Sequence, residues 1–153
     1  MNIYTAIVFA IAMGYLEAAV VVYLRELYYP EGFYIKEKVK FPFIKFGAVS
    51  ELKPFPPKII LTEVGREAAT IIMLGGFAVA AGNTFVTSLG YFLILFGVWD
   101  IFYYVFLKII LNWPESFSTT DVFFLIPVPW IGPVWLPIFL SGIIIAIGLI
   151  ILL

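Results

Sequence analysis

The sequence predicts an all-α integral membrane protein built as a bundle of four transmembrane helices. Of its 153 residues, 63% are hydrophobic and only 12% are charged, whereas soluble domains use roughly 45 to 50% apolar residues. Four apolar stretches each reach the length of about 20 residues that a helix needs to cross a bilayer. These spans and one sizeable loop account for the chain, so we expect a single transmembrane domain over residues 1–153.

The first span is expected over about residues 3–27. Glu17 is the single charged side chain among the first twenty-four residues. On a helix it shares a face with Ala6, Ala10 and Met13. Because small side chains mark helix contacts in lipid and charges avoid the acyl chains, Glu17 is expected to point toward other helices.

The one long polar connection, about residues 28–58, follows this span. In its middle, apolar and basic side chains alternate, with Ile35, Val39, Phe41 and Phe43 set against Lys36, Lys38, Lys40 and Pro42. A period of two predicts a short strand or β-hairpin with one basic face. This face fits either anionic lipid headgroups or a partner protein.

The second span is expected over about residues 59–82. Glu63, Arg66 and Glu67 lie in its first turns, and fifteen uncharged residues follow. Both carboxylates share a helix face with small residues further along, so this span is predicted to carry its ionisable groups toward the bundle interior.

The third span is expected over about residues 89–111, with Asp100 near its middle. Tyr103 and Tyr104 follow on the same side of the helix. Two phenols beside a carboxylate are placed to donate hydrogen bonds to it, which would lower the cost of a charge in a low dielectric.

Residues 112–133 combine Trp113, Trp130, Glu115 and Asp121 with four prolines. Proline every few residues prevents a continuous helix. The segment is therefore expected to be either an interfacial loop pinned by its tryptophans or a partly re-entrant segment. The last span, about residues 134–153, carries no charge. It is expected to pack against the other helices and to anchor the chain in the bilayer.

The distribution of basic residues predicts the orientation. With four spans, all nine Lys and Arg residues fall in or beside the two connections on one side. By the positive-inside rule, both termini are expected outside and the basic loop in the cytoplasm, in a multi-pass protein of the cell membrane.

A polar cluster is expected in the inner half of the bilayer. At about 1.5 Å per residue, Glu17 and Glu67 lie roughly 12 Å from the cytoplasmic ends of their helices and Asp100 roughly 16 Å. The cluster is predicted to contain Glu17, Glu63, Arg66, Glu67, Asp100, Tyr103 and Tyr104, with Arg25, Lys108, Glu115 and Asp121 as further contributors. Since acids outnumber the nearby arginine, at least one should be neutral or hold a cation.

This cluster supports several functions. It fits a transport-type protein for protons, cations or small solutes, or a structural subunit whose buried network fixes a larger complex. A membrane-embedded enzyme would instead use carboxylate-bound Mg²⁺ or Mn²⁺, or acid–base chemistry on a lipid. The sequence holds no phosphate loop, serine nucleophile motif or Asp-rich diphosphate motif, which favours a role other than catalysis.

Composition excludes several classes of site. The chain has no Cys and no His, so disulfides, iron–sulfur clusters, His-ligated haem and zinc sites are not expected, and a divalent cation would need oxygen ligands. The net charge of −1 gives no reason to expect nucleic acid. Expected partners are the lipid bilayer and either further copies of the chain or a larger membrane complex. The absence of Gln suggests a thermophilic source.

Overall fold

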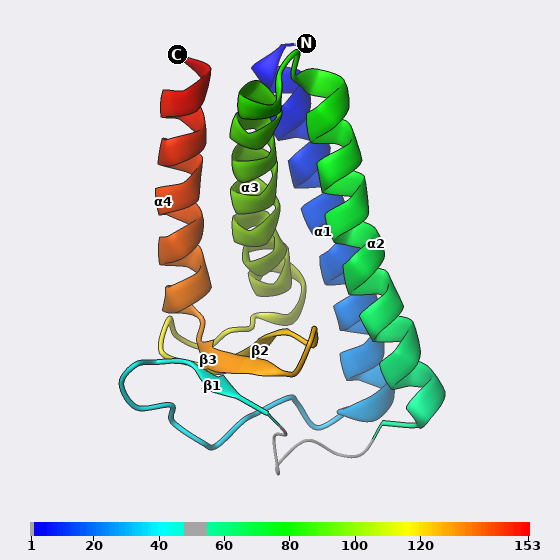
Figure 1. The fold of residues 1–153 in the computed structure, drawn as a ribbon. Helices are drawn as coiled ribbons and strands as arrows, with labels where there is room; N and C mark the ends of the chain where they lie inside the picture. Colours follow the sequence, from blue (N-terminus) through cyan, green and yellow to red (C-terminus); the bar gives the residue numbers. More distant parts are fainter. Residues whose placement is uncertain (1, 48–54) are drawn as a thin grey trace.

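The computed structural model describes residues 2–47 and 55–153. Its four long helices are α1 (Ile3–Tyr28), α2 (Pro57–Ala81), α3 (Phe85–Leu111) and α4 (Trp135–Leu152). Each is long and apolar enough to cross a membrane, which confirms four helices of spanning length. The two ends of the chain lie together at one end of the helices (Figure 1).

Helix boundaries follow local capping. α3 begins earlier than predicted because Thr84 and Thr87 form a reciprocal capping box, in which each side chain accepts a hydrogen bond from the other's backbone N–H. α2 begins at Pro57, where a missing backbone donor costs nothing. Gly82 ends α2 in a tight turn, since a Cβ there would lie 2.4 Å from the backbone nitrogen of Ser88.

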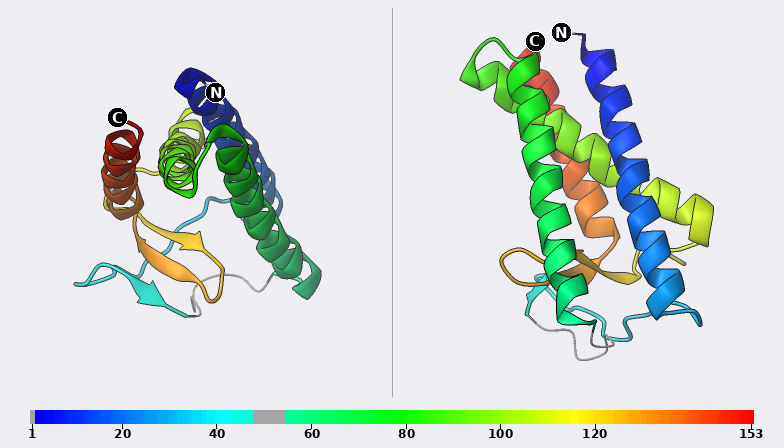
Figure 2. Two further views of the ribbon diagram at one scale, coloured as in Figure 1. Left: turned by 45° about the horizontal axis from the view of Figure 1, so that its top comes forward. Right: turned by 90° about the vertical axis from the view of Figure 1, so that its right-hand side faces the viewer.

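α3 is the central helix. Seen from the end that holds the termini, it lies between α4 on one side and α1 and α2 on the other (Figure 2), and it packs against all three. Gly97 lets α3 approach α4 closely, since a Cβ there would lie 2.8 Å from the backbone oxygen of Ser141. α4 buries Ser141 and Gly148, two of its few small residues.

Residues 112–133 contain an antiparallel hairpin, which the prediction of an interfacial loop or a partly re-entrant segment did not include. β2 (Thr120–Phe124) pairs with β3 (Trp130–Pro133), and β1 (Lys45–Phe46) pairs with the other edge of β3. This small sheet lies at the end of the helices away from the termini (Figure 1). The all-α prediction was therefore wrong here: the prolines break a helix, but Pro127 and Pro129 fall in the hairpin turn and Pro133 at a strand end, where they are tolerated, and Pro114 precedes the hairpin.

The predicted strand or hairpin over residues 35–43 was also wrong, because within the described part of this connection only Lys45–Phe46 is a strand. The alternation reports burial only at Ile35 and Val39, because Phe41 and Phe43 are exposed. Ile35 is buried with Ile131 in a small apolar cluster that includes Val122, and Lys36, Lys38 and Lys40 are exposed. The connection therefore packs onto the sheet by one face over residues 35–39. Lys53 lies outside the described residues.

Candidate binding cavity

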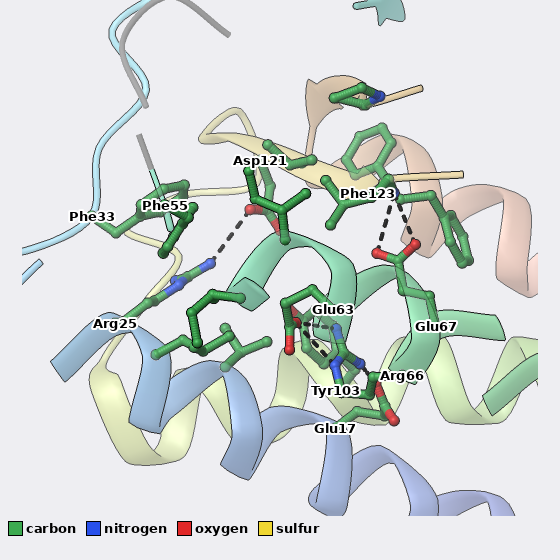
Figure 3. Close-up of a pocket in the computed structure, with 18 of the residues that line it drawn as sticks. Glu17, Arg25, Phe33, Phe55, Glu63, Arg66, Glu67, Tyr103, Asp121 and Phe123 are labelled. Carbon is green, nitrogen blue, oxygen red and sulfur yellow. Dashed lines mark hydrogen bonds and ion pairs between the residues drawn. The ribbon is translucent and has the colours of Figure 1, made fainter. Parts of the chain in front are cut away.

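A cavity of about 350 Å³ lies at the sheet end of the helices (Figure 3). α1 and α2 form two sides, α3 forms a third, and β2 with the hairpin turn closes the end toward the sheet. Its lining is largely aliphatic and aromatic, and includes Val21, Leu24, Phe33, Phe55, Ile59, Ile60, Trp99, Phe123 and Phe124. Seven ionisable side chains of opposite signs interrupt these apolar surfaces.

Arg66 of α2 forms the centre of one polar group. Its Nη1 pairs with Glu17 of α1, while Nε and Nη2 donate to Glu63 Oε2 at 3.0 and 2.8 Å. Thr70 donates to the other oxygen of Glu17 at 2.6 Å. One guanidinium thus joins two carboxylates on two helices, as the dashed lines in Figure 3 show.

Glu67 and Asp100 do not join Arg66, although both were expected in its network. The carboxylate of Glu67 accepts the backbone N–H of Leu125, at 2.9 and 3.2 Å for its two oxygens. Asp100 accepts the hydroxyl of Ser141 on α4 at 2.7 Å. Neither carboxyl group therefore has a cationic partner among the hydrogen bonds and ion pairs of the described residues. Both still line the cavity.

Arg25 and Asp121 form a second polar group where α1 meets the sheet. Arg25 Nη2 lies 3.4 Å from Asp121 Oδ1, and Tyr104 donates to Asp121 Oδ2 at 3.0 Å. The guanidinium carbon lies 3.7 Å from the Trp113 ring centroid and 4.5 Å from that of Phe33, within the range of cation–π attraction. Burial raises the pKa of the Asp121 carboxyl, and Arg25 acts in the opposite direction.

The remaining predicted residues divide between the cavity and the outer surface. Tyr103 lines the cavity, but Tyr104 bonds Asp121 instead of the expected Asp100. Lys108 donates to the backbone oxygens of Asn112 and Pro114, at the end of α3. Glu115 accepts the Tyr34 phenol at 3.1 Å, a bond that raises the pKa of Tyr34. Lys108 and Glu115 therefore lie outside this cavity.

Sequence reasoning missed the polar partners Thr70, Ser141 and the Leu125 amide. Thr70 and Ser141 had a usable signal, because each shares a helix face with small buried residues. The Leu125 amide had none, since its position depends on the hairpin. The importance of Asp121 was underestimated for the same reason.

The cavity carries more negative than positive groups. Five carboxyl groups (Glu17, Glu63, Glu67, Asp100 and Asp121) and two guanidinium groups (Arg25 and Arg66) line it. The acids are nevertheless dispersed: within residues 2–47 and 55–153, no three acidic side chains lie close enough together to hold a metal ion.

Comparisons with protein-family models, with curated proteins and with solved structures give no match. The function of the cavity is therefore inferred from its geometry and chemistry alone.

Proposed function

We propose that the chain is a small multi-pass membrane protein of the transport type, which takes up a small solute in the cavity at the sheet end of its helices. The observation that carries this proposal is the cavity itself, about 350 Å³ in volume and lined by apolar side chains with a few ionisable groups. Pockets for small molecules typically measure about 300 to 1,000 Å³ and combine apolar walls with a few convergent polar groups.

The placement of the ionised groups supports transport. Charged side chains within membrane-spanning segments generally mark solute or ion pathways. Here Glu17, Glu63 and Arg66 come from the candidate spans α1 and α2. Their contact is also one of few between these two helices, so a modest separation of α2 from α1 would open the cavity toward the bilayer.

The orientation belongs to the proposal as well. Arg25 and Lys108 lie in the last turns of α1 and α3, and Lys45 lies in the sheet, so these basic groups gather at the end away from the termini. By the positive-inside rule this end faces the cytoplasm and both termini face outside. The cavity then opens in the inner half of the cell membrane.

A structural subunit of a homo-oligomer or larger membrane complex is the second candidate. The observation that favours it is that each of the five acids lining the cavity has a hydrogen-bond or ion-pair partner. A fully paired network can fix a helix arrangement without binding any solute.

The test is solute binding and uptake by the purified protein. A panel of organic cations, organic anions and neutral solutes would be screened by thermal unfolding in detergent, and each ligand would be assayed for uptake into proteoliposomes. Val21→Trp fills the cavity, whereas Val8→Trp places the same bulk on α1 at an exposed position. We expect Val21→Trp to abolish binding and uptake, and Val8→Trp to leave both unchanged.

Binding and uptake that both variants retain would move the transport site away from this cavity. If no solute binds and no solute or proton flux exceeds that of empty liposomes, transport is refuted and the structural subunit becomes the better explanation.

A further inference from the structure

We infer that the cavity takes an organic cation, a positively charged nitrogen group carried on an apolar body. This inference rests on the proposed function and names the class of its solute. It follows from the charge balance of the cavity, from the one carboxylate best placed to contact a ligand, and from the aromatic side chains around it.

The charge balance leaves carboxylates uncompensated. Arg66 serves two acids, Glu17 and Glu63, and Glu67 and Asp100 are bonded to an amide and a hydroxyl. Among these five acids, only Asp121 is paired with a cation, Arg25, that it shares with no other acid. Ionised, these groups leave a formal excess of three negative charges around one cavity. Such an excess in a low dielectric is stabilised by a bound cation.

Glu63 is the carboxylate best placed for contact. Only its Oε2 accepts from Arg66, and Oε1 makes none of the hydrogen bonds found among the described residues. Its side chain keeps 14% of its surface exposed, against 7% for Glu17 and 3% for Asp121. Figure 3 shows the Glu63 carboxylate beside Arg66, among the side chains that line the pocket.

The arginines offer less to an anion. All three nitrogen atoms of the Arg66 guanidinium are engaged by Glu17 or Glu63. Arg25 is covered by the rings of Trp113 and Phe33, and its Nη1, although without a hydrogen-bond partner, is buried. Each guanidinium is already paired with at least one carboxylate, so an anion bound there would lie beside a negative charge that is already in place.

The surrounding side chains fit an organic rather than a metal cation. Aromatic rings line the cavity from α3, from β2 and from the connections next to α1 and α2, among them Phe33, Phe55, Trp99, Tyr103, Phe123 and Phe124. Aromatic faces attract quaternary ammonium groups, and the aliphatic side chains of α1 and α2 can cover an apolar body. A bare metal ion needs several oxygen ligands at short distance, and the described acids do not converge in that way.

The experiment compares three small probes that share a benzyl group, by calorimetric titration of the full chain in detergent at neutral pH. The probes are benzyltrimethylammonium, phenylmethanesulfonate and benzyl alcohol, which carry a positive charge, a negative charge and none. We expect benzyltrimethylammonium to bind at least about tenfold more tightly than either of the others, as one charge-assisted contact can provide.

The variants Glu63→Gln and Glu67→Gln each remove one charge and keep an oxygen for the observed hydrogen bond. Each should weaken cation binding by about tenfold or more. Glu115→Gln is the matched control, because Glu115 is exposed and lies outside this cavity; it should leave binding unchanged.

Tighter binding of the sulfonate, equal binding of all three probes, or cation binding unchanged in both Glu63→Gln and Glu67→Gln would overturn the inference. The proposed function would survive these outcomes if another solute in the uptake panel depends on Val21. Only the absence of binding and uptake across the whole panel removes both.

Discussion

Replacing Arg66 by alanine should destabilise the protein severely. The substitution leaves Glu17 and Glu63 without their common cation, and their side chains are only 7% and 14% exposed. Removing one partner of a buried ion pair costs about 3 to 5 kcal/mol, because the remaining charge stays buried without compensation. Arg66 is itself 20% exposed, so the lower end of that range is the better expectation.

Thermal unfolding in detergent measures this effect, with Lys45→Ala as the control. Lys45 also forms an ion pair, with Glu37 at 2.6 Å, but the two side chains are 44% and 36% exposed. Exposed pairs contribute about 0 to 1 kcal/mol. In a chain of this size each kcal/mol shifts the midpoint by roughly 2 to 4 °C, so Arg66→Ala should melt about 6 to 12 °C below the wild type and Lys45→Ala within about 4 °C of it.

A second variant tests the cause. If uncompensated acids produce the loss, the triple variant Arg66→Met with Glu17→Gln and Glu63→Gln should regain most of the stability, since no buried charge then remains in this group. Equal melting of Arg66→Ala and Lys45→Ala would refute the reasoning. So would a triple variant that melts no higher than Arg66→Ala.

Three further predictions concern topology, helix packing and pH. A cysteine at Lys45 should label from the cytoplasm and one at Thr84 from outside, in line with the positive-inside rule; the reverse pattern would invert the proposed orientation. Gly97→Ala should lower the unfolding midpoint by the equivalent of about 1 to 3 kcal/mol, because its Cβ would lie 2.6 Å from a side-chain carbon of α4. Gly142→Ala, whose Cβ would meet nothing within 4 Å, should be neutral or slightly stabilising. Burial raises the folded-state pKa of Asp121 above its usual 3.8. The contribution of Asp121 to the free energy of unfolding should therefore fall as the pH rises from 3.8 through the folded-state pKa. Asp121→Asn should remove this part of the pH dependence of melting, and identical pH profiles would contradict the assignment.

The helices were predictable because one physical requirement dominates them. A span must be apolar over a fixed length, and this property can be read from any window of the sequence. Counting the rise per residue also gave Glu17 and Glu67 the same height, and the structure brings Glu17 into contact with Arg66, the residue before Glu67. Relative height along the bundle could be predicted because it depends only on position along one helix.

Partner choice could not be predicted in this way, because it depends on how distant segments fold. Glu67 bonds the Leu125 amide, and Arg25 bonds Asp121; both partners are positioned by a hairpin that the proline pattern concealed. The sequence Thr120–Phe124 is rich in β-branched and aromatic residues, which is a strand signal. In a chain this apolar, that signal is hard to separate from the general hydrophobicity.

The central position of β3 in the sheet has a consequence for biosynthesis. β3 pairs on one edge with Lys45–Phe46, made long before it, and on the other with β2, made just before it. A nascent chain that has completed α3 therefore still lacks the amide that binds Glu67 and the carboxylate that binds Arg25. Because early segments emerge before their distant partners exist, the cavity cannot be complete until translation has passed Pro133 and the hairpin has formed.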